Sequence, residues 1–527
     1  MSTPGSDQRY FLTTSIPYVN AAPHVGHALE FVQADVFARY RRLRGDDTRF
    51  LTGTDENSLK NVLAAEKEGI PVAQLVERNS RAFGDLARLL DVSHDDFIRT
   101  SVEERHSAGA RKLWEACDRN GDIYKRTYEG LYCVGCELFY TEEELVDGLC
   151  PEHGTRPELV EEENYFFRLS RYGDRLAEFV DSGALRIVPE TRRNEARAFI
   201  ARGLEDFSVS RSQARARGWG IPVPGDPGQV MYVWFDALTN YITALDYATD
   251  GELYRRYWRE NPLRVHFIGK GILRFHAIYW PAMLLSAGEL APSAIFVHGY
   301  LTIGGQKISK SLGNVIDPAA LVERYGVDPV RYWLLREVPA TDDADYTDEK
   351  LERRYTADLA NDLGNLLNRT VSMIQRYRGG QVPEPGALGD LDHDLQSVAA
   401  GLASRVTDAM ERDLDPQAAL RAIWELVGRA NRYVQETAPW ELAKAERNGD
   451  ADAAQRLSTA LYSLAESLCL IAQALQIFLP RTSQRIAEQL GVPLVTTGWV
   501  DSLSRGCLPK GTTVAQPQPI FPKLENL

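Results

Sequence analysis

The stretch Arg9–Gly53, RYFLTTSIPYVNAAPHVGHALEFVQADVFARYRRLRGDDTRFLTG, predicts how the chain begins to fold. Arg9–Ile16 is rich in β-branched and aromatic residues and ends before a proline, which is typical of a strand. After a short loop, apolar residues recur every three or four positions up to Leu43, which predicts a helix, and Gly45 fits the position after its end. Thr48–Gly53 is the next predicted strand. Strand, helix and strand in this order open a parallel, doubly wound sheet, which binds ligands at the carboxyl ends of its strands.

The composition is that of a large globular protein. The chain has 527 residues, 44% apolar and 25% charged, which is enough for about three or four domains. Six cysteines are too few for a disulfide scaffold, and the first eight residues contain no apolar signal core. A net charge of −14 argues against a basic surface that coats nucleic acid generally, but it does not exclude a nucleic-acid partner held by local basic patches. We therefore expect a soluble, cytoplasmic protein that does not insert into a membrane.

The pattern of apolar and polar residues changes along the chain. An inserted module is predicted from about residue 117, and the strand pattern returns at Gln229–Phe235, Arg264–Gly269 and Ala294–Leu301. From about residue 350 the apolar residues follow a helical period, with helices expected at about 395–412, 416–437 and 453–478. We therefore expect an α/β fold whose parallel sheet is split by an insertion and followed by an all-α helix bundle.

Two motifs indicate phosphate chemistry. In Pro23–His27 (PHVGH), two imidazoles three residues apart share one face at a helix N-terminus, where free N–H groups attract phosphates. Gly26 between them lets a ligand approach the backbone. Later in the chain, Gly304–Ser311 (GGQKISKS) offers mobile ammonium groups that can clamp a leaving pyrophosphate. Taken singly, the first motif is more often an ordinary pair of histidines, and the second an ordinary solvated basic loop.

A third motif indicates a metal. Cys133-Val134-Gly135-Cys136 is followed by Cys150-Pro151-Glu152-His153, inside the predicted insertion. Four nitrogen and sulfur ligands at this spacing suit a closed, structural zinc knuckle. The alternative is a set of reduced thiols in a small core. Cys117, Cys469 and Cys507 are expected to be plain thiols.

Together, HVGH and KISKS make the chain resemble the class I aminoacyl-tRNA synthetases, because both nucleotide signatures occur in the right order. Further segments resemble the methionyl-tRNA synthetases within that class. They are Ser15–Asn20 (SIPYVN), Leu51–Glu56 (LTGTDE), Tyr232–Ala237 (YVWFDA), His266–Lys270 (HFIGK) and Ala438–Trp440 (APW). The resemblance runs from about residue 9 to residue 524.

The resemblance implies a set of site residues. For catalysis it implies His24, His27, Lys307 and Lys310, and for ATP binding these four with Gly26, Ser309 and Ser311. For methionine it implies Ile16, Tyr18, Asp55, Arg211, Trp234, Ala237, Leu238, Tyr241, Ile272 and His276. Asp55 would bind the substrate ammonium and Arg211 would pair with Asp55, while the rings suit the sulfur of methionine. For a CAU anticodon it implies Asn365, Arg369, Pro439 and Trp440, with Trp440 stacking on a base.

The implied function is ATP-dependent activation of L-methionine and transfer to tRNA(Met), a ligase reaction, with Mg²⁺ on ATP and one structural Zn²⁺ on Cys133, Cys136, Cys150 and His153. We expect a Rossmann catalytic domain in two halves, residues 1–116 and 229–302. The insertion covers residues 117–228, with its knuckle at 133–153. Residues 303–355 hold the KISKS loop and a stem-contact region, and residues 356–527 the anticodon-binding bundle and tail. Because no appended dimerisation domain follows, we expect a monomer.

The chain departs from the family at a few positions. Asn57 and Ser58 replace a His-Gly pair, Gly271 replaces an aspartate, and Leu238 stands where some relatives have proline. Loss of a carboxylate at Gly271 is expected to weaken a contact to the nucleotide. Two alternatives therefore stay open: a paralogue that adenylates another small apolar or thiol amino acid, and a tRNA-binding protein without catalysis.

Overall fold

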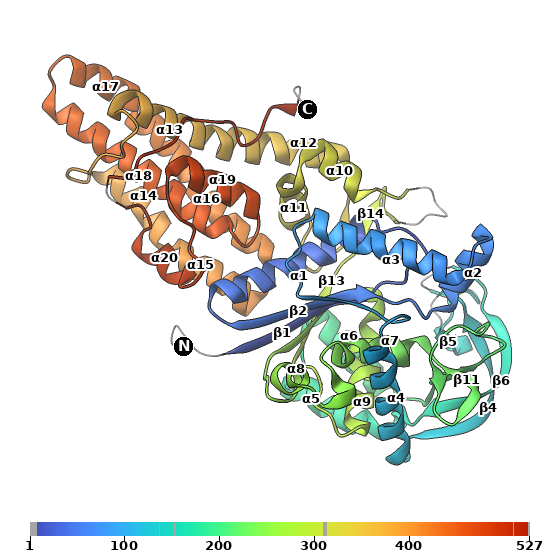
Figure 1. Ribbon diagram of the computed structural model, residues 1–527. Coiled ribbons are helices and arrows are strands. Elements are labelled where there is room, and N and C mark those ends of the chain that lie inside the picture. The colour runs from blue at the N-terminus through green and yellow to red at the C-terminus, as the bar shows by residue number, and fades with distance from the viewer. Residues whose placement is uncertain (1–7, 136–137, 152–153, 309–313, 510, 525–527) are drawn as a thin grey trace.

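A computed structural model of the chain describes residues 8–135, 138–151, 154–308, 314–509 and 511–524 (Figure 1). Its centre is a six-stranded parallel sheet in the order β3-β2-β1-β12-β13-β7. The strands are β1 (Arg9–Thr14), β2 (Asp47–Thr54), β3 (Asp96–Arg99), β7 (Arg186–Val188), β12 (Arg264–Gly269) and β13 (Ala294–His298). The chain runs outward from β1 to β2 on one side and later pairs β12 with β1 on the other. This reversal at β1 is the place where parallel sheets bind ligands.

Helices cover both faces of this sheet. Phe11 and Leu12 are neighbours on β1, yet they belong to different apolar cores, because successive strand residues point to opposite faces. One face carries α1 (Val25–Leu43), α2 (Leu59–Glu68) and α3 (Val72–Leu89), and the other α4 (Glu104–Arg119), α7 (Val233–Thr243) and α9 (Trp280–Ser286), as Figure 1 shows. Helix α1 ends before Gly45, whose φ of +92° suits glycine, as the sequence predicted.

The insertion is built on antiparallel strands. One sheet has the order β5-β4-β6-β8 and a smaller one β10-β11-β9. Their strands are β4 (Ile123–Cys133), β5 (Leu138–Tyr140), β6 (Glu158–Phe167), β8 (Phe207–Ser208), β9 (Ser210–Ser212), β10 (Pro222–Val223) and β11 (Asp226–Met231). Between them lie η1 (Glu142–Glu144), α5 (Gly173–Ser182) and α6 (Glu190–Ala201). Strand β7 departs from the expectation of one insertion over 117–228, because it returns to the edge of the parallel sheet beside β13.

Two predicted strands differ from the structure. Gln229–Phe235 is a strand only up to Met231, and Val233 already begins helix α7, whose residues are buried all round. Ala294–Leu301 is two strands, β13 and β14 (Leu301–Ile303), separated by a bend at Gly299. A side chain at Gly299 would lie 2.2 Å from the backbone of Asp342, so this close approach requires glycine between the two strands. The hairpin continues into β15 (Gln306–Lys307), and β14 also pairs with β16 (Ala344–Asp345).

The second half is a helix bundle. It consists of α10 (Pro318–Tyr325), α11 (Val327–Arg336), α12 (Asp348–Arg354), the π-helical segment η8 (Tyr355–Gly364), α13 (Asn365–Arg378), α14 (Asp390–Ala400), α15 (Leu402–Asp408), η9 (Ala409–Asp413), α16 (Pro416–Thr437), α17 (Pro439–Arg447), α18 (Ala451–Leu475), α19 (Pro480–Leu490) and α20 (Trp499–Arg505). In the described part of the chain, one helix, α18, is long and apolar enough to cross a membrane, and 83% of its most apolar window is buried in the bundle.

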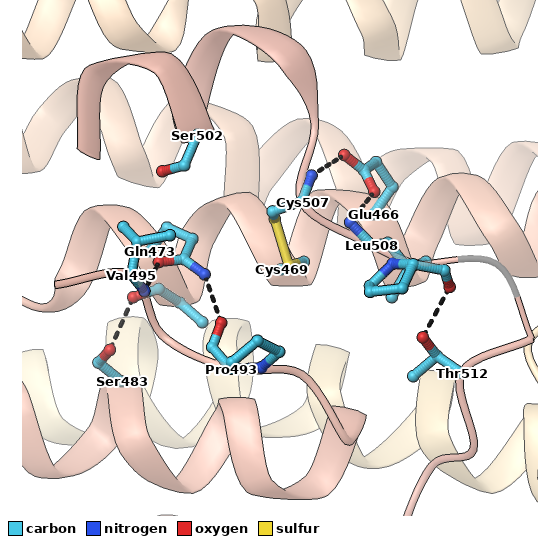
Figure 2. Close-up of a disulfide and its surroundings, with 12 residues drawn as sticks. Glu466, Cys469, Gln473, Ser483, Pro493, Val495, Ser502, Cys507, Leu508 and Thr512 are labelled. Carbon is cyan, nitrogen blue, oxygen red and sulfur yellow. Dashed lines mark hydrogen bonds between the residues drawn. A yellow bond between two sulfur atoms is a disulfide. The ribbon is translucent and has the colours of Figure 1, made fainter. Parts of the chain in front are cut away.

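A disulfide joins α18 to the C-terminal segment, which corrects the expectation of plain thiols. Cys469 of α18 is bonded to Cys507, and Glu466 one turn earlier accepts the backbone N–H groups of Cys507 and Leu508 (Figure 2). The pairing was not foreseeable because 38 residues separate the two cysteines. Cys117, by contrast, is a buried thiol as expected.

Candidate functional site

The turn between β1 and α1 is closed by its two histidines. His24 Nδ1 accepts the backbone N–H of Gly26 at 3.1 Å, and the backbone N–H of His24 donates to His27 Nδ1 at 3.1 Å. The two rings lie 4.0 Å apart. A side chain at Gly26 would meet the His24 ring at 2.9 Å. Glycine is therefore needed here so that the capping imidazole can close over the helix N-terminus, a reason that the sequence analysis did not give.

These hydrogen bonds place the ring protons. Since Nδ1 of each ring accepts a backbone N–H, the hydrogen of each neutral imidazole sits on Nε2. Burial, followed by the neighbouring His24, holds the pKa of His27 well below its ordinary value. The neutral rings therefore offer Nε2–H donors, which suit an anion such as phosphate. The first backbone N–H groups of α1 already have acceptors, because Gly26 donates to His24 Nδ1 and Val25 to the carbonyl of Ile316.

A buried carboxylate–imidazole pair joins the ends of β1 and β13. Glu30 Oε1 accepts the N–H and hydroxyl of Ser15 at 2.8 and 2.6 Å, and Glu30 Oε2 lies 2.8 Å from His298 Nε2. His298 Nδ1 lies 2.7 Å from the carbonyl of Gly299, which can only accept, so Nδ1 carries a hydrogen. This pair was not predicted from the sequence; the available signal was a glutamate among the apolar positions of a core helix.

Helix α7 carries one wall of the predicted methionine pocket. Its four predicted residues recur at helical spacing and are buried: Trp234, Ala237, Leu238 and Tyr241. Trp234 stacks on Phe275 with ring centroids 3.7 Å apart and meets Tyr18 edge to face at 6.2 Å. Ile16 and Ile272 are half-buried and pack against the same core. The structure thus gathers the apolar and aromatic members of the pocket at the carboxyl ends of β1 and β12.

Two polar groups inside this pocket are locked to each other. His276 Nδ1 lies 2.9 Å from the carbonyl of Ile272 and therefore carries a hydrogen, so His276 Nε2 accepts the hydroxyl of Tyr241 at 2.7 Å. Burial lowers the pKa of His276 to about 4, although the bond to Ile272 opposes the shift. The imidazole is neutral at physiological pH, and the hydroxyl oxygen of Tyr241 is held at a fixed place in the pocket.

Asp55 brings a carboxylate to the same pocket. Its backbone pairs with Tyr18 in an isolated bridge, and its N–H donates to the carbonyl of Pro17 at 2.9 Å. The residue is 2% exposed, and its Oδ1 accepts the N–H of Asn57 at 3.3 Å. A buried carboxylate beside an aromatic ring suits a substrate ammonium group.

Arg211 lies on β9 and is buried. Its Nη1 donates to Ser208 Oγ at 2.8 Å and to the carbonyl of Ser210 at 2.7 Å, and its guanidinium lies 4.3 Å from the ring of Tyr232. The pairing of Arg211 with Asp55 stays a prediction.

The departures from the family have local roles. Asn57, which stands where relatives have histidine, donates to Asp236 Oδ2 at 2.7 Å and so connects the loop after β2 to α7. The other carboxylate oxygen of Asp236, Oδ1, lies 2.5 Å from His106 Nε2. Ser58 caps α2 by accepting the N–H of Lys60 at 3.0 Å. Gly271 is exposed in the one-turn helix η5 (Lys270–Ile272).

A cavity of about 520 Å³ opens beside the pocket, between the parallel sheet and the insertion. Its lining includes Tyr18, Lys60, Trp234, Lys270 and Gly271. This volume is within the usual range for a small-molecule site, and the cavity lies at the strand ends where the topology predicts one.

The KISKS loop is described only in its first part. The hairpin turns at Gly304 and Gly305, and Asp345 Oδ1 holds it by accepting Thr302 Oγ1 at 2.8 Å and the N–H of Gly305 at 2.9 Å. Lys307 ends β15. The predicted residues Ser309, Lys310 and Ser311 lie outside the described residues.

Two of the four predicted zinc ligands are described. Cys133 and Cys150 are each 1% exposed and share a small core with Tyr140 and Leu145. Cys136 and His153 lie outside the described residues, and the remainder contains no group of three potential metal ligands. Buried, adjacent thiols in a core this small fit a structural metal.

The predicted anticodon residues meet on one surface of the bundle. Asn365 and Arg369 lie one turn apart on α13, and the guanidinium of Arg369 is 5.8 Å from the ring of Trp440. Pro439 and Trp440 begin α17, where Pro439 is buried and Trp440 is 40% exposed. Asn361, exposed one turn before Asn365, was not in the prediction, although its spacing of four placed it on the same face.

Comparison with known proteins gives the same assignment. Residues 10–155 and 152–371 match the family model of class I tRNA synthetases (M), and residues 382–527 match the anticodon binding domain of methionyl tRNA ligase. Methionine–tRNA ligases are similar along nearly the whole chain. That of Brucella suis is 45% identical over 98% of both chains, and that of Caldanaerobacter subterraneus is 47% identical over 98% of this chain and 79% of the relative.

Solved structures agree. Mycobacterium tuberculosis methionyl-tRNA synthetase in complex with methionyl-adenylate is 44% identical and superimposes with a TM-score of 0.92, covering 98% of this chain and 100% of that one. Its apo form gives a TM-score of 0.85 at 41% identity. Given these matches, and the histidine turn and aromatic pocket at one edge of its sheet, the chain belongs to the methionyl-tRNA synthetases, the methionine–tRNA ligases of class I.

Proposed function

We propose that the chain joins L-methionine to the AMP part of ATP, with release of pyrophosphate, and passes the methionyl group to the 3′ end of tRNA(Met). The observation that carries this proposal is the locked Tyr241–His276 pair inside an aromatic pocket, which lies at the same sheet edge as the Nε2–H donors of His24 and His27. One group of residues suits a thioether, and the other suits phosphates.

The first step is a displacement at phosphorus. A carboxylate oxygen of methionine attacks the α-phosphorus of ATP, the bond from that phosphorus to the bridging oxygen breaks, and pyrophosphate leaves with the electron pair. The protein supplies no nucleophile; it positions the reactants and stabilises charge. His24 and His27 donate to the phosphate oxygens as charge develops, and Lys307 and Lys310 stabilise the pyrophosphate. Mg²⁺ bound with ATP would neutralise part of the same charge.

Selection of methionine depends on the pocket. The rings of Tyr18 and Trp234 face the sulfur, which makes favourable contacts with aromatic edges. Because the hydroxyl hydrogen of Tyr241 is donated to His276, it is not available to the substrate, and the oxygen of Tyr241 is held at one place in the pocket. Asp55 binds the ammonium group and thereby aligns the carboxylate for attack.

The second step takes place with tRNA bound along the bundle. Asn361, Asn365, Arg369 and Trp440 read the CAU anticodon, with Trp440 stacking on a base, a contact of about 1–3 kcal/mol. The 3′-terminal hydroxyl attacks the carbonyl carbon, AMP leaves, and the hydroxyl proton goes to the departing phosphate. One Zn²⁺ held by Cys133, Cys136, Cys150 and His153 would support the insertion. We propose a cytoplasmic monomer.

The test is amino-acid-dependent exchange between ATP and pyrophosphate, with all twenty amino acids and homocysteine assayed separately. We expect exchange to be strongest with methionine, and His24→Ala to lower its rate by about 100- to 1,000-fold, as for loss of one transition-state donor. His393→Ala, an exposed histidine on α14, is the matched control and should keep the wild-type rate. Equal rates in the His24 variant, or stronger exchange with another amino acid, would overturn the assignment.

A further inference from the structure

The consecutive helical segments α12, η8 and α13 carry buried residues at a spacing that a regular α-helix cannot hold on one face. Leu351, Tyr355, Leu359, Leu363, Leu367 and Val371 recur every four residues, and each is at most 2% exposed. In an α-helix each residue turns by about 100°, so a step of four overshoots a full turn by about 40°. Five such steps would rotate the stripe by about 200° and carry its last members to the opposite face.

The structure solves this with the π-helical segment η8 between α12 and α13 (Figure 1). Its hydrogen bonds span five residues instead of four, so its wider turn rotates less per residue and brings the stripe back into line. The polar face has the same spacing of four: Asn361 and Asn365 are exposed, and Arg369 is half-buried. The π segment therefore sets the direction in which the proposed anticodon-reading side chains point.

Side chains of α16 donate to backbone carbonyls of the widened segment. At the end of that segment, the N–H of Asn365 is shared between the carbonyls of Ala360 and Asp362. Asn431 Nδ2 of α16 donates to that carbonyl at 3.0 Å. One backbone turn earlier, Trp424 Nε1 of the same helix lies 3.4 Å from the carbonyl of Asp358.

The Asp358 side chain is fixed as well. Its Oδ2 accepts the hydroxyl of Tyr332 at 2.7 Å and lies 3.1 Å from Arg354 Nη1, while the rings of Tyr332 and Trp424 lie 4.5 Å apart. The π segment is thus held from α11, α12 and α16 together. Because these side chains bind the segment in its π form, they favour that form over a regular α-helix.

We propose that Asn431 and Trp424 are positioning residues for anticodon recognition: they stabilise η8 and thereby fix the rotation of α13 that presents Asn361, Asn365 and Arg369 to tRNA. This inference rests on the proposed function, because it assumes that this face reads the anticodon. Neither residue is proposed to touch the nucleic acid.

The test separates charging from activation. Asn431→Leu keeps the side-chain size but removes the donor, and we expect the KM for tRNA(Met) to rise about three- to tenfold, the usual effect of one hydrogen bond. Discrimination against a tRNA with an altered anticodon should fall by a similar factor. Methionine-dependent exchange between ATP and pyrophosphate, which needs no tRNA, should stay within twofold. Amide hydrogen exchange should rise in residues 355–365.

Conservative variants and a control complete the test. Asn431→Gln keeps an amide donor and should recover part of the tRNA affinity, and Trp424→Phe, which removes only the indole donor and part of the ring, gives an independent measurement if the Asn431 variants do not fold. Gln484→Leu, a change to an exposed polar residue on α19 whose side chain donates to Glu488 at 2.9 Å, should match wild type.

Two results would overturn the inference: an unchanged tRNA KM and anticodon discrimination in both the Asn431→Leu and Trp424→Phe proteins, or equal losses of charging and of methionine activation, which would mean a general structural role. Wild-type charging that ignores the anticodon is a different outcome. It would contradict the proposed function of this face and not only the role of Asn431.

Discussion

At the scale of single residues, the site depends on imidazoles that stay neutral. His27 is kept neutral by burial and by its neighbour His24, and His276 by burial. In each case a backbone group selects the ring nitrogen that carries the hydrogen. A charged His276 could no longer accept the hydroxyl of Tyr241, and the oxygen that we propose to contact the thioether would turn. The specificity of the pocket is therefore tied to one proton.

This dependence gives a prediction about pH. The pKa of His276 is about 4 in the folded chain, against an ordinary 6.5. Between these values the unfolded chain binds the extra proton, so the free energy of unfolding falls as pH drops from 6.5 to 4, by up to about 3 kcal/mol. The KM for methionine should be flat from pH 6 to 8 and rise below about pH 5. Melting temperatures measured over this range should fall less in His276→Gln than in wild type; parallel curves would contradict the prediction.

The residues that the sequence could predict are those whose own type carries the chemistry. The histidines of HVGH and the rings of the pocket are such residues, and the structure brings them to one edge of the sheet. The Glu30–His298 and Asn57–Asp236 contacts were not predicted, because 268 and 179 residues separate the partners. Which groups meet across such distances depends on the register of the sheet, and no local pattern encodes it.

At the scale of elements, the end of the insertion that carries Cys133 and Cys150 is held by little apolar packing. The core around Cys133 and Cys150 also includes Tyr140 and the half-buried Leu145. Strands β4 and β6 extend far beyond it, pairing from Ile123 with Phe167 to Tyr132 with Glu158. So small a core does not stabilise a fold alone, which is why a metal is expected at this end of the strands.

We expect about one zinc ion per purified chain. Removal of the metal by a strong chelator should increase amide hydrogen exchange around residues 129–158 and leave the helix bundle unchanged. Cys133→Ser should lower the zinc content well below one, whereas Cys117→Ser, a change to a buried thiol of the main core, should retain it. A metal-free protein with full protection in this region would contradict the prediction.

Some elements were predicted well and others were not, for physical reasons. Arg264–Gly269 matches β12 residue for residue, because buried parallel strands are short, continuous apolar runs. Val233–Phe235 has the same composition yet begins a fully buried helix, and periodicity alone cannot separate these two cases. The π segment was also not predicted, although the spacing of four between the buried apolar residues from Leu351 to Val371 indicates it.

At the scale of the whole molecule, one buried arginine joins the sheet domain to the bundle. Arg331 of α11 lies 2.8 Å from Asp35 of α1 and donates to the carbonyls of Leu90 and Phe478 at 2.9 and 2.8 Å. Both charged side chains are fully buried. Burial would raise the pKa of Asp35, but Arg331 and Arg39 outweigh it and lower that pKa. The three partners come from three separate parts of the chain, so this residue fixes how the catalytic and anticodon-binding parts are placed.

Replacing this residue should destabilise the molecule strongly. In Arg331→Met, Asp35 keeps its contact with Arg39 but loses its fully buried partner, and we expect a loss of about 3 kcal/mol in the free energy of unfolding. Arg81→Met removes an exposed pair with Glu77 and should cost less than about 1 kcal/mol. Thermal unfolding followed by calorimetry measures both. If Arg331 only fills space, the apolar side chain of methionine should substitute with a loss no larger than that of the control. If Arg331 joins the sheet domain to the bundle, the unfolding transitions of these two parts should also separate in Arg331→Met, because the contact that couples the two parts is lost.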